Sequence, residues 1–459
     1  MFTVKDILMS TTGVLLSGNE NEILRGVSTD TRRLKGGELF VAIKGVRFDG
    51  HNFILDAVSK GAGAVLVQDG CITNSNFKLP DTSLISVPNS ITALGDIARF
   101  HRARFKIPLI GITGSNGKTT TKEMTAAILA KKFNIIKNFG TENNHIGVPL
   151  TLMRINADHK IAVLEMGTNH LGEIKRLSEI AAPTMAIITN IGPSHLQHLK
   201  DMDTVLKAKC EVLDYFRDKE ATVVVNGDDD LLKKVKTDLK TIKFGLNKDF
   251  DFYADKVDLQ ADGINFRLNG KWEINLTVVG RHNVYNALAA IAASWQFGVD
   301  IAEIQEALKE FRVPNMRMEV KRLKDIKIIN DTYNSNPMSM RHAIEALKDI
   351  TTKGRKVLVA GDMLELGHLS GRFHHLVGRQ AAESGIDLIV AVGKLAEFIS
   401  NGAQEAGMSE KKIKRCNLTR EACEAVLHLI KKGDTVLIKG SRAMKMEQIV
   451  RELEVQFKV

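Results

Sequence analysis

A glycine-rich segment, GITGSNGKTTT at residues 111–121, carries the residue types that bind phosphate. Its glycines allow a tight turn whose backbone N–H groups point at phosphate oxygens, and a helix that follows adds its positive dipole end. Lys118 supplies a charge for the β- and γ-phosphates, the Thr119 hydroxyl can ligate Mg²⁺, and Thr120 can cap the helix. We therefore predict a nucleotide-binding loop rather than an unoccupied turn. Its candidate residues are Gly114, Ser115, Asn116, Gly117, Lys118, Thr119 and Thr120.

Acidic side chains end two apolar segments downstream of this loop. Glu165 ends IAVLE, where a carboxylate of a phosphate-loop protein can hold or orient the metal ion. We predict a Mg²⁺ role for Glu165, because a glutamate directly after four apolar strand residues is rare. Asp228 and Asp229 follow VVVNG and compete for this role, but an Asn-Gly-Asp turn explains them nearly as well.

Other polar residues have both a chemical and a structural interpretation. His195 follows MAIITNI and a Gly-Pro turn, at the edge of the sheet where ligands bind in open α/β folds, but a structural turn histidine is equally consistent. His198 completes HLQH, which is weak evidence for zinc, and we assign it to the surface. Lys209 reads as an exposed helix residue. Asn283 and Asn286 share one face of an Ala-rich helix, although capping also explains the first.

Apolar strands that alternate with longer amphipathic stretches must position these residues. IPLIGIT, IAVLEMG, MAIITNI and ATVVVNG are separated by helix-like segments, which indicates a parallel sheet with helical crossovers. A linker near residue 105 and a break at 312–314 divide the pattern. We predict an α/β protein of three domains that span residues 1–105, 106–312 and 313–459.

The composition argues against several classes of protein. No stretch approaches the roughly 20 apolar residues of a membrane span, and the four cysteines are scattered, so we expect a cytoplasmic protein without membrane insertion, disulfides or structural zinc. The net charge of +10 fits nucleic acid or small polyanionic substrates equally well. The basic residues are spread out, and only four Tyr and two Trp can stack on bases, so we expect no nucleic-acid partner.

The order of motifs along most of the chain resembles the Mur ligase family. GITGSNGKTT has the family's GxxGxxGKT spacing and is followed by NNHIGVPLTL, LEMG, TNIGPSH, AKCE, GRHNVYNALAA, NMRMEV, DTYNSNP, GDMLELG and KGSRAMKMEQIV. DTYNSNP and GDMLELG are similar to the dipeptide-adding branch, and the DNPR motif of the branch that adds meso-diaminopimelate is absent. The resemblance implies an N-terminal UDP-binding α/β domain, a central P-loop ATPase domain with a mainly parallel sheet, and a C-terminal Rossmann-like α/β domain that closes over ATP and binds the incoming dipeptide.

The resemblance also implies roles for individual residues. Lys118 would contact the phosphates, Thr119 and Glu165 would hold one Mg²⁺, and His195 with Lys209 would hold a second. Lys209 would be carbamylated, since a carbamate is an anionic oxygen ligand whereas an ammonium group repels a cation. The implied ATP contacts outside the loop are Asn283, Asn286, Arg317 and Asp331, and the implied UDP-substrate contacts are Ser28, Asp30 and Arg32. Asn336, Lys439, Ser441 and Arg442 lie in third-domain signatures without an assigned role. Cys210 takes a place often held by Gly, which leaves the packing beside Lys209 open.

The implied reaction is ATP-dependent amide ligation through an acyl phosphate, with two Mg²⁺ ions. It would join D-alanyl-D-alanine to the terminal carboxylate of UDP-N-acetylmuramoyl-tripeptide in peptidoglycan precursor synthesis, carried out by a monomer. Whether the tripeptide ends in lysine or meso-diaminopimelate stays open. The alternatives are a nucleotide-binding switch, for which an NKxD-type guanine motif is absent, a phosphotransferase acting on a small hydroxyl compound, and another Mur-type ligase, tripeptide-forming or folylpolyglutamate-like.

Overall fold

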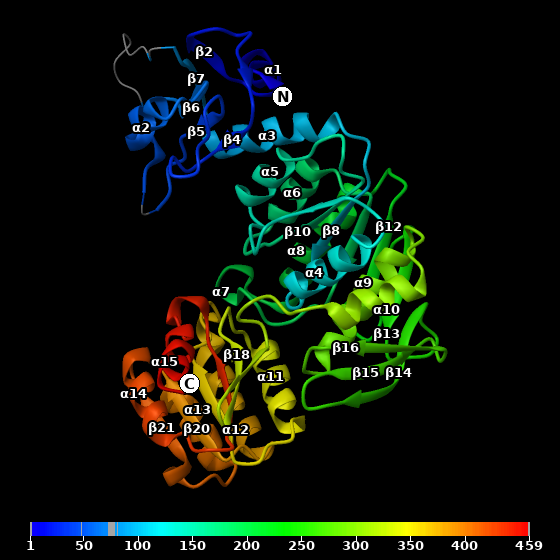
Figure 1. Cartoon of the computed structure of the whole chain (residues 1–459), viewed down its shortest axis with the longest axis vertical. Coiled ribbons are helices and arrows are strands. Elements are labelled where there is room, and N and C mark those ends of the chain that lie inside the picture. Colours follow the sequence, from blue (N-terminus) through cyan, green and yellow to red (C-terminus); the bar gives the residue numbers. More distant parts are fainter. Residues whose placement is uncertain (1, 47, 72–78, 80, 458–459) are drawn as a thin grey trace. The chain divides into compact units, whose positions relative to one another are not determined.

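The computed structural model describes residues 2–46, 48–71, 79 and 81–457. Contacts divide the chain into two compact units. The first comprises Met1–Gly111, Phe133–Gly167 and Glu173–Thr184, and the second comprises Ile112–Lys132, Thr168–Gly172 and Met185–Val459. Figure 1 shows the course of the chain and the labels of its elements.

The first unit begins with a five-stranded sheet in the order β2-β7-β6-β5-β4. Its strands are β2 (Val14–Ser17), β4 (Val27–Ser28), β5 (Leu39–Val41), β6 (Ala64–Gln68) and β7 (Ser83–Val87), all parallel except for the antiparallel β2–β7 pair. A two-stranded ladder joins β1 (Phe2–Thr3) to β3 (Ile23–Leu24), and the helices are α1 (Val4–Ser10), η1 (Gly50–Phe53), α2 (Ile54–Ser59) and α3 (Ser90–Ala103). β5 and β6 supply Phe40, Val65 and Val67 to the core of this sheet.

The rest of the first unit is a parallel β-structure covered by helices. It contains β9 (Ile135–Lys137), β10 (Ile161–Glu165), α5 (Gly147–Leu152) and α6 (Glu173–Ala181). Every residue of β10 is buried, as expected for a parallel strand covered on both faces. The Ala162 N–H donates to the Pro108 carbonyl at 3.0 Å, and the Thr184 N–H donates to the Leu109 carbonyl at 2.9 Å, on either side of the start of β8 (Leu109–Thr113).

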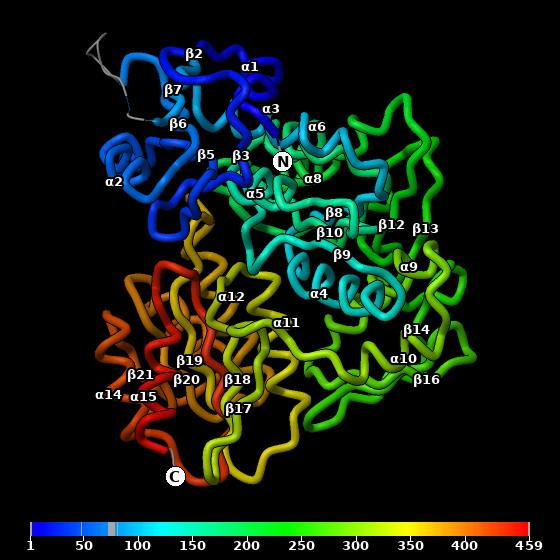
Figure 2. The backbone as a smooth tube through the Cα atoms, turned by 45° about the horizontal axis from the view of Figure 1, so that its top comes forward, coloured from blue at the N-terminus to red at the C-terminus, as the bar shows by residue number. Residues whose placement is uncertain are grey.

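The second unit contains a sheet that changes from parallel to antiparallel pairing. Its strands are β11 (Met185–Ile188), β12 (Thr222–Asn226), β13 (Lys240–Gly245), β14 (Phe252–Leu259), β15 (Ile264–Leu268) and β16 (Trp272–Leu276), in that order across the sheet. The pairs from β11 to β14 are parallel, and β14-β15-β16 is an antiparallel meander. The helices of this part are α4 (Lys118–Leu129), α7 (Leu196–Leu199), α8 (Met202–Tyr215), η2 (Leu232–Lys234), α9 (His282–Trp295) and α10 (Ile301–Glu310). The Ala-rich α9 is buried along most of its length and packs against α4, and the two lie side by side in Figure 2.

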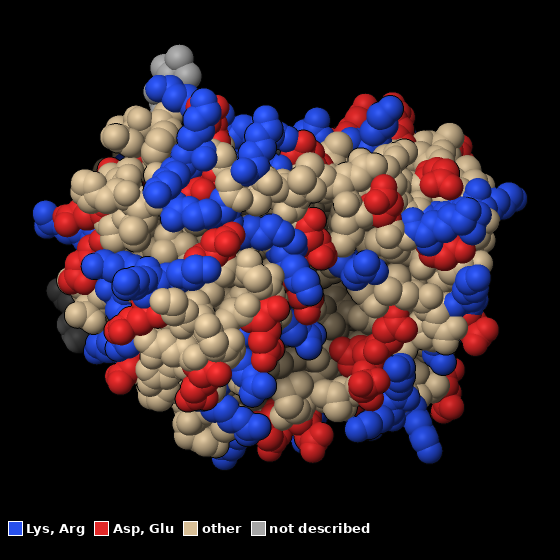
Figure 3. Space-filling view, turned by 90° about the horizontal axis from the view of Figure 1, so that it is seen from below, with Lys and Arg blue, Asp and Glu red and all other residues tan. Residues whose placement is uncertain are grey.

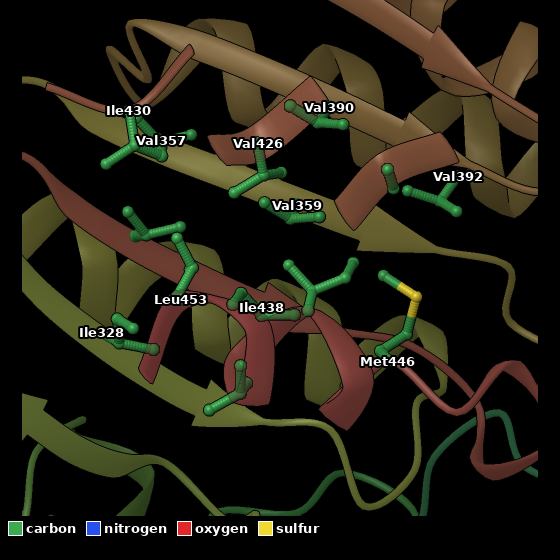
Figure 4. Close-up of a cluster of buried hydrophobic side chains, with 14 of the residues drawn as sticks. Ile328, Val357, Val359, Val390, Val392, Val426, Ile430, Ile438, Met446 and Leu453 are labelled. Carbon is green, nitrogen blue, oxygen red and sulfur yellow. The ribbon is translucent and has the colours of Figure 1, made fainter. Parts of the chain in front are cut away.

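The remainder of the second unit is a doubly wound sheet in the order β17-β18-β22-β19-β20-β21. Its strands are β17 (Glu319–Leu323), β18 (Ile326–Asp331), β19 (Lys356–Gly361), β20 (Leu388–Val392), β21 (Ile413–Cys416) and β22 (Thr435–Lys439), parallel except for the β17–β18 hairpin. Its helices are α11 (Pro337–Asp349), η3 (Gly367–Leu369), α12 (Ser370–Glu383), α13 (Ala396–Glu405), η4 (Glu410–Lys412), α14 (Thr419–Leu429), η5 (Arg442–Met444) and α15 (Glu447–Phe457). Side chains of α14 and α15 such as Val426 and Leu453 close the core over Val359 and Ile438, as Figure 4 shows.

Two further features concern the surface and the helices. On the face shown in Figure 3, acidic side chains lie between the basic ones, in line with the spread of basic residues along the sequence. Within the described part of the chain, no helix is both long enough and apolar enough to cross a membrane.

Candidate active site

The glycine-rich loop lies between a buried strand and a helix, as predicted. All five residues of β8 are buried, and α4 begins at Lys118. Gly114 and Gly117 have φ values of +136° and +81°, a backbone region that side chains disfavour. A Cβ atom at Gly117 would also lie 2.2 Å from Asn286 Oδ1. Both glycines are therefore required by the shape of the turn.

Hydrogen bonds hold this loop to the segment that follows β11. The Asn116 N–H donates to Asn190 Oδ1 at 2.9 Å, and the Thr189 hydroxyl donates to the Asn116 carbonyl at 2.6 Å. The Ser115 hydroxyl bonds to the Gly192 carbonyl and accepts the Gly192 N–H, both at 2.9 Å. These hydrogen bonds fix the backbone conformation of the loop, and a preorganised loop favours recognition of phosphate.

The loop's charged and hydroxyl side chains lie around the start of α4. Lys118 Nζ donates to the loop's own carbonyls, at 2.8 Å to Gly114 and 3.2 Å to Ser115. Thr119 and Thr120 are buried beside it. The prediction that Thr120 caps the helix is wrong, because the N-cap of α4 is Gly117 and Thr120 lies inside the first turn. An ammonium group and a hydroxyl group at a helix N-terminus form a site suited to a phosphate and its counter-ion.

The two predicted asparagines of α9 support the loop from behind. Asn286 Nδ2 donates to Asn283 Oδ1 at 2.8 Å, and Asn283 Nδ2 donates to the Val279 carbonyl at 2.8 Å. The Thr121 hydroxyl donates to Asn286 Oδ1 at 3.3 Å. The prediction that these asparagines share one face is confirmed, and their observed contacts link α9 to α4.

Lys209 is buried, so its interpretation as an exposed helix residue is wrong. Its side chain is 1% exposed, and Nζ donates to the Thr168 carbonyl at 3.3 Å. The buried positions Val205, Ala208, Lys209 and Val212 repeat as i, i+3, i+4 and i+7, so the helical periodicity already placed this lysine on the apolar face. Lysine side chains are rarely buried this completely, so the burial itself makes Lys209 a functional candidate.

The neighbour of Lys209 and the histidines of α7 complete this region. Burial raises the pKa of the Cys210 thiol to about 12, so it is protonated and acts as a packed side chain.

His195 lies at the N-terminus of α7, and its Nδ1 is 2.6 Å from Glu365 Oε2. This bond holds the pKa of the Glu365 carboxyl below its ordinary value. His198 is exposed, as predicted, and its ring packs against that of His170 in a tilted arrangement, with 4.4 Å between ring centroids and 43° between ring planes.

Glu165 and the two competing aspartates have different environments. The Glu165 side chain is 1% exposed, Asn143 Nδ2 donates to its Oε1 at 2.7 Å, and its backbone exchanges two hydrogen bonds with Asn138. Asp228 accepts the Leu246 N–H and the Tyr285 hydroxyl, and Asp229 accepts three backbone N–H groups, from Ile191, Leu231 and Leu232. The two aspartates therefore have structural roles, whereas the buried carboxylate of Glu165 remains the metal-ligand candidate.

The C-terminal sheet contributes a contact to the loop that the sequence did not predict. Asn336, the N-cap of α11, donates from Nδ2 to Asn116 Oδ1 at 2.8 Å. The buried Lys439 lies 2.5 Å from Asp331 and donates to the Asn334 carbonyl at 2.9 Å, which fixes the turn that leads to Asn336. Arg317 lies over the Tyr333 ring, with 4.2 Å from its Cζ to the ring centroid.

The remaining signature residues shape neighbouring turns. The Ser441 hydroxyl accepts the Leu364 N–H at 2.8 Å, and Arg442 pairs with Glu447 at 3.1 Å. His282 and His342, which the sequence did not single out, stack with their rings 5.5 Å apart, and burial lowers their pKa values to about 4 and about 3.

The predicted UDP-substrate residues lie at the end of β4 and in the turn that follows it. The Ser28 hydroxyl donates to the Asp30 carbonyl at 2.9 Å, and the Arg32 guanidinium donates to the Asp30 carboxylate at 2.6 Å. The hydrogen bond from Arg32 is the main cause that lowers the pKa of Asp30 to about 2. Arg32 itself is largely exposed. Asp30 and Arg32 lie in a polar turn at the surface of the first unit, and the buried Ser28 bonds this turn to the end of β4.

The donor chemistry fits magnesium better than a protein-only metal centre. Among the described residues, no group of three or more His, Cys, Asp or Glu side chains is placed to hold a metal ion. Mg²⁺ commonly takes only one or two carboxylates from the protein and fills its remaining positions with phosphates and water. The Thr119 hydroxyl, at the start of the helix that follows the phosphate loop, is an oxygen donor that suits such a site.

Comparison with known proteins identifies the family of this phosphate-loop α/β protein. Three family models match in order: Mur ligase family, catalytic domain (residues 24–102), Mur ligase middle domain (112–294) and Mur ligase, glutamate ligase domain (316–442). The chain belongs to the Mur ligase family.

Similar relatives cover almost the whole chain. The UDP-N-acetylmuramoyl-tripeptide--D-alanyl-D-alanine ligase of Bacillus subtilis is 37% identical, with 98% of each chain covered. The enzyme of the same name from Escherichia coli is 35% identical, with 94% of each covered. A crystal structure of MurF from Acinetobacter baumannii superposes with a TM-score of 0.88 and 31% identity, with 98% of each chain covered. The predicted α/β class and three-domain Mur ligase organisation are thereby confirmed.

Proposed function

We propose that this chain is an ATP-dependent amide ligase that joins D-alanyl-D-alanine to the terminal carboxylate of UDP-N-acetylmuramoyl-tripeptide in peptidoglycan precursor synthesis. The observation that carries the proposal is the bond from Asn336 to Asn116. Asn336 belongs to DTYNSNP, one of the signatures similar to the dipeptide-adding branch, and Asn116 belongs to the phosphate loop. A motif similar to the dipeptide-adding branch therefore contacts the phosphate loop, which has the spacing of the whole Mur ligase family.

The proposed chemistry proceeds in two steps. A carboxylate oxygen of the tripeptide attacks the γ-phosphorus of ATP, and ADP leaves. The amine of D-alanyl-D-alanine then attacks the acyl carbon of the acyl phosphate, phosphate leaves, and the amine gives up a proton. Because the first step brings two anions together, Lys118 and the loop N–H groups lower its barrier by neutralising charge. Closure of the C-terminal domain keeps water from the acyl phosphate.

Magnesium would supply further charge neutralisation on the phosphates. We assign Thr119 and Glu165 to one ion, and His195 with a carbamylated Lys209 to a second. The burial of Lys209 supports this assignment, because a carbamate is an anion that a cation stabilises in a buried site.

The remaining roles follow the same proposal. Asn283, Asn286, Arg317 and Asp331 contact ATP, and Ser28, Asp30 and Arg32 contact the UDP group. The domains span residues 1–105, 106–312 and 313–459, and each of the three family matches falls inside one of these ranges, which supports the division. The enzyme works as a cytoplasmic monomer without nucleic acid, and the third residue of its tripeptide is lysine or meso-diaminopimelate.

The test is product formation with defined substrates. We expect phosphate release only when ATP, the UDP-linked tripeptide and D-alanyl-D-alanine are all present, and an amide-linked product by mass spectrometry. Supplying both forms of the tripeptide separately identifies its third residue. Hydrolysis of ATP without the dipeptide would favour a switch, and phosphorylation of a hydroxyl compound would favour a phosphotransferase.

A loop variant with a matched control tests the residue assignment. Lys118→Ala should abolish acyl-phosphate formation and leave binding of the UDP substrate nearly intact. Lys131→Ala removes a lysine that follows the same helix and pairs with Glu310 at 2.8 Å, so it should leave turnover unchanged. Wild-type turnover in Lys118→Ala would refute the assignment.

A further inference from the structure

Two residues with left-handed backbones are joined by a hydrogen bond, and one of them, His195, is a proposed metal ligand. His195 has a φ of 54° and Glu365 a φ of 64°, a conformation that residues with a Cβ atom rarely adopt. His195 Nδ1 is 2.6 Å from Glu365 Oε2, and the Gln197 N–H donates to the Glu365 carbonyl at 3.0 Å. Glu365 lies in GDMLELG, after β19, and His195 follows β11.

Buried groups hold Glu365 in this position. The Leu364 N–H donates to the Ser441 hydroxyl, and the Met363 N–H donates to His374 Nε2, both at 2.8 Å. Ser441, His374 and the side chain of Leu366 are buried. Residues of the C-terminal domain therefore fix the turn that carries Glu365. The Glu365 carboxylate contacts His195 only when the C-terminal domain is docked against the central domain.

Stability does not explain the pair. The Glu365 side chain is 47% exposed, and ion pairs with this much solvent contribute little to the free energy of folding. A left-handed backbone at two residues with side chains has a cost, and such strain gathers at functional sites. The arrangement is better explained by what the carboxylate does to the imidazole.

A carboxylate can only accept a hydrogen bond, so the Nδ1 atom of His195 must donate it. In a neutral imidazole, the proton then lies on Nδ1 and the lone pair on Nε2. A carboxylate that accepts the second N–H of a ligating histidine fixes its tautomer and ring orientation and makes it a better ligand.

We propose that Glu365 is a positioning residue that selects the Nδ1-protonated tautomer of His195 and thereby prepares Nε2 for the metal ion of the bound nucleotide. Because Glu365 comes from the C-terminal domain and His195 from the central domain, docking of the two domains prepares the ligand. This inference rests on the proposed metal role of His195.

Two substitutions distinguish the effect of the Glu365 carboxylate from the effect of the left-handed backbone at this position. Glu365→Gly removes the side chain and favours the left-handed backbone, so stability should be equal or higher. Glu365→Gln keeps an oxygen that accepts from Nδ1 but removes the negative charge. The matched control is Glu405→Gln, because Glu405 forms a similar pair with His375 at 2.9 Å on the surface of the C-terminal domain.

The experiment uses the full chain with a non-hydrolysable ATP analogue, ¹⁵N-histidine NMR assigned with His195→Gln, and Mn²⁺ titration followed by EPR. In the wild-type chain and in Glu365→Gln we expect the Nδ1-protonated tautomer. Glu365→Gly should lose this preference and bind Mn²⁺ with a Kd raised about 10-fold or more, while Glu405→Gln changes neither.

Three outcomes would overturn the inference: Glu365→Gly with an unchanged tautomer, Glu365→Gly with unchanged Mn²⁺ affinity, or a wild-type chain that binds no Mn²⁺ with the nucleotide. The proposed function fails by a different result, the absence of an amide product in the wild-type chain. The NMR and EPR measurements do not depend on product formation, so the two failures are distinguishable.

Discussion

Asn336 performs two tasks that substitutions can separate. Its Oδ1 accepts the Ser339 N–H at 2.9 Å and caps α11, and its Nδ2 donates to Asn116 in the phosphate loop. Serine at position 336 can still cap the helix, but its short side chain cannot reach Asn116. Alanine at this position can do neither.

The two losses have predictable sizes. Removal of an N-terminal cap costs about 1 kcal/mol, and serine caps about as well as asparagine. Loss of the neutral hydrogen bond to Asn116 costs about 1 kcal/mol, within a range of about 0.5–1.5 kcal/mol. Since 1.4 kcal/mol corresponds to a factor of ten, each loss corresponds to about a fivefold change.

Two assays read these losses independently. In Asn336→Ala, the amides in the first turn of α11 should exchange with deuterium about fivefold faster, whereas Asn336→Ser should match the wild-type chain. Both variants should lower kcat/KM for amide formation by about fivefold, because both lose the contact with Asn116. In a double-mutant cycle with Asn116→Ala, the two positions should couple by about 0.5–1.5 kcal/mol.

Specific results would refute this reasoning. If Asn336→Ser retains wild-type kcat/KM, or if the cycle gives no coupling, the bond between α11 and the loop has no role in catalysis. If the helix amides in Asn336→Ser exchange as fast as in Asn336→Ala, the cap assignment is wrong.

Three further predictions concern buried groups. Lys209→Ala should lower amide formation by about 10²–10³-fold, and a short-chain carboxylic acid should restore part of it; full activity without the acid would exclude a carbamate role. Burial lowers the pKa values of His282 and His342 to about 4 and about 3, below the ordinary 6.5. Between pH 6.5 and pH 4, the unfolded chain therefore binds more protons at these two histidines than the folded chain does. As the pH falls through that window, the free energy of unfolding should fall by up to about 1.4 kcal/mol per pH unit for each histidine. The urea midpoint of His342→Phe should therefore fall less steeply with decreasing pH than that of the wild-type chain. Equal slopes of urea midpoint against pH would contradict the assignment. Lys439→Met leaves Asp331 without its buried partner and should lower the free energy of unfolding by about 3–5 kcal/mol, a loss that Asp331→Asn in the same chain should partly restore in urea titrations.

The local parts of the site could be predicted from the sequence because they depend on short stretches of backbone. Glycines at positions 114 and 117 and the apolar run before them indicated the strand, turn and helix that the structure shows. The predicted strand began two residues early, at Ile107. The observed strand begins at Leu109, after Pro108, which has no N–H to donate to a neighbouring strand.

The parts that the sequence missed depend on contacts between distant segments. Glu365 and Asn336 lie in motifs that resemble family signatures, but nothing in the local sequence indicates that Glu365 contacts His195 or that Asn336 contacts Asn116. His282 gave no signal, since its partner is a histidine on another helix. Lys209 was the exception: its spacing from buried apolar residues was visible in the sequence, but its charge suggested solvent.

The close approach of Gly117 to Asn286 constrains how this chain can be recombined with its relatives. No side chain fits at position 117 while an amide occupies that space, so the loop and α9 are shaped to each other. A chimera whose crossover falls between these two positions inherits one partner from each parent. Such hybrids should bind nucleotide only where both parents carry the same pair.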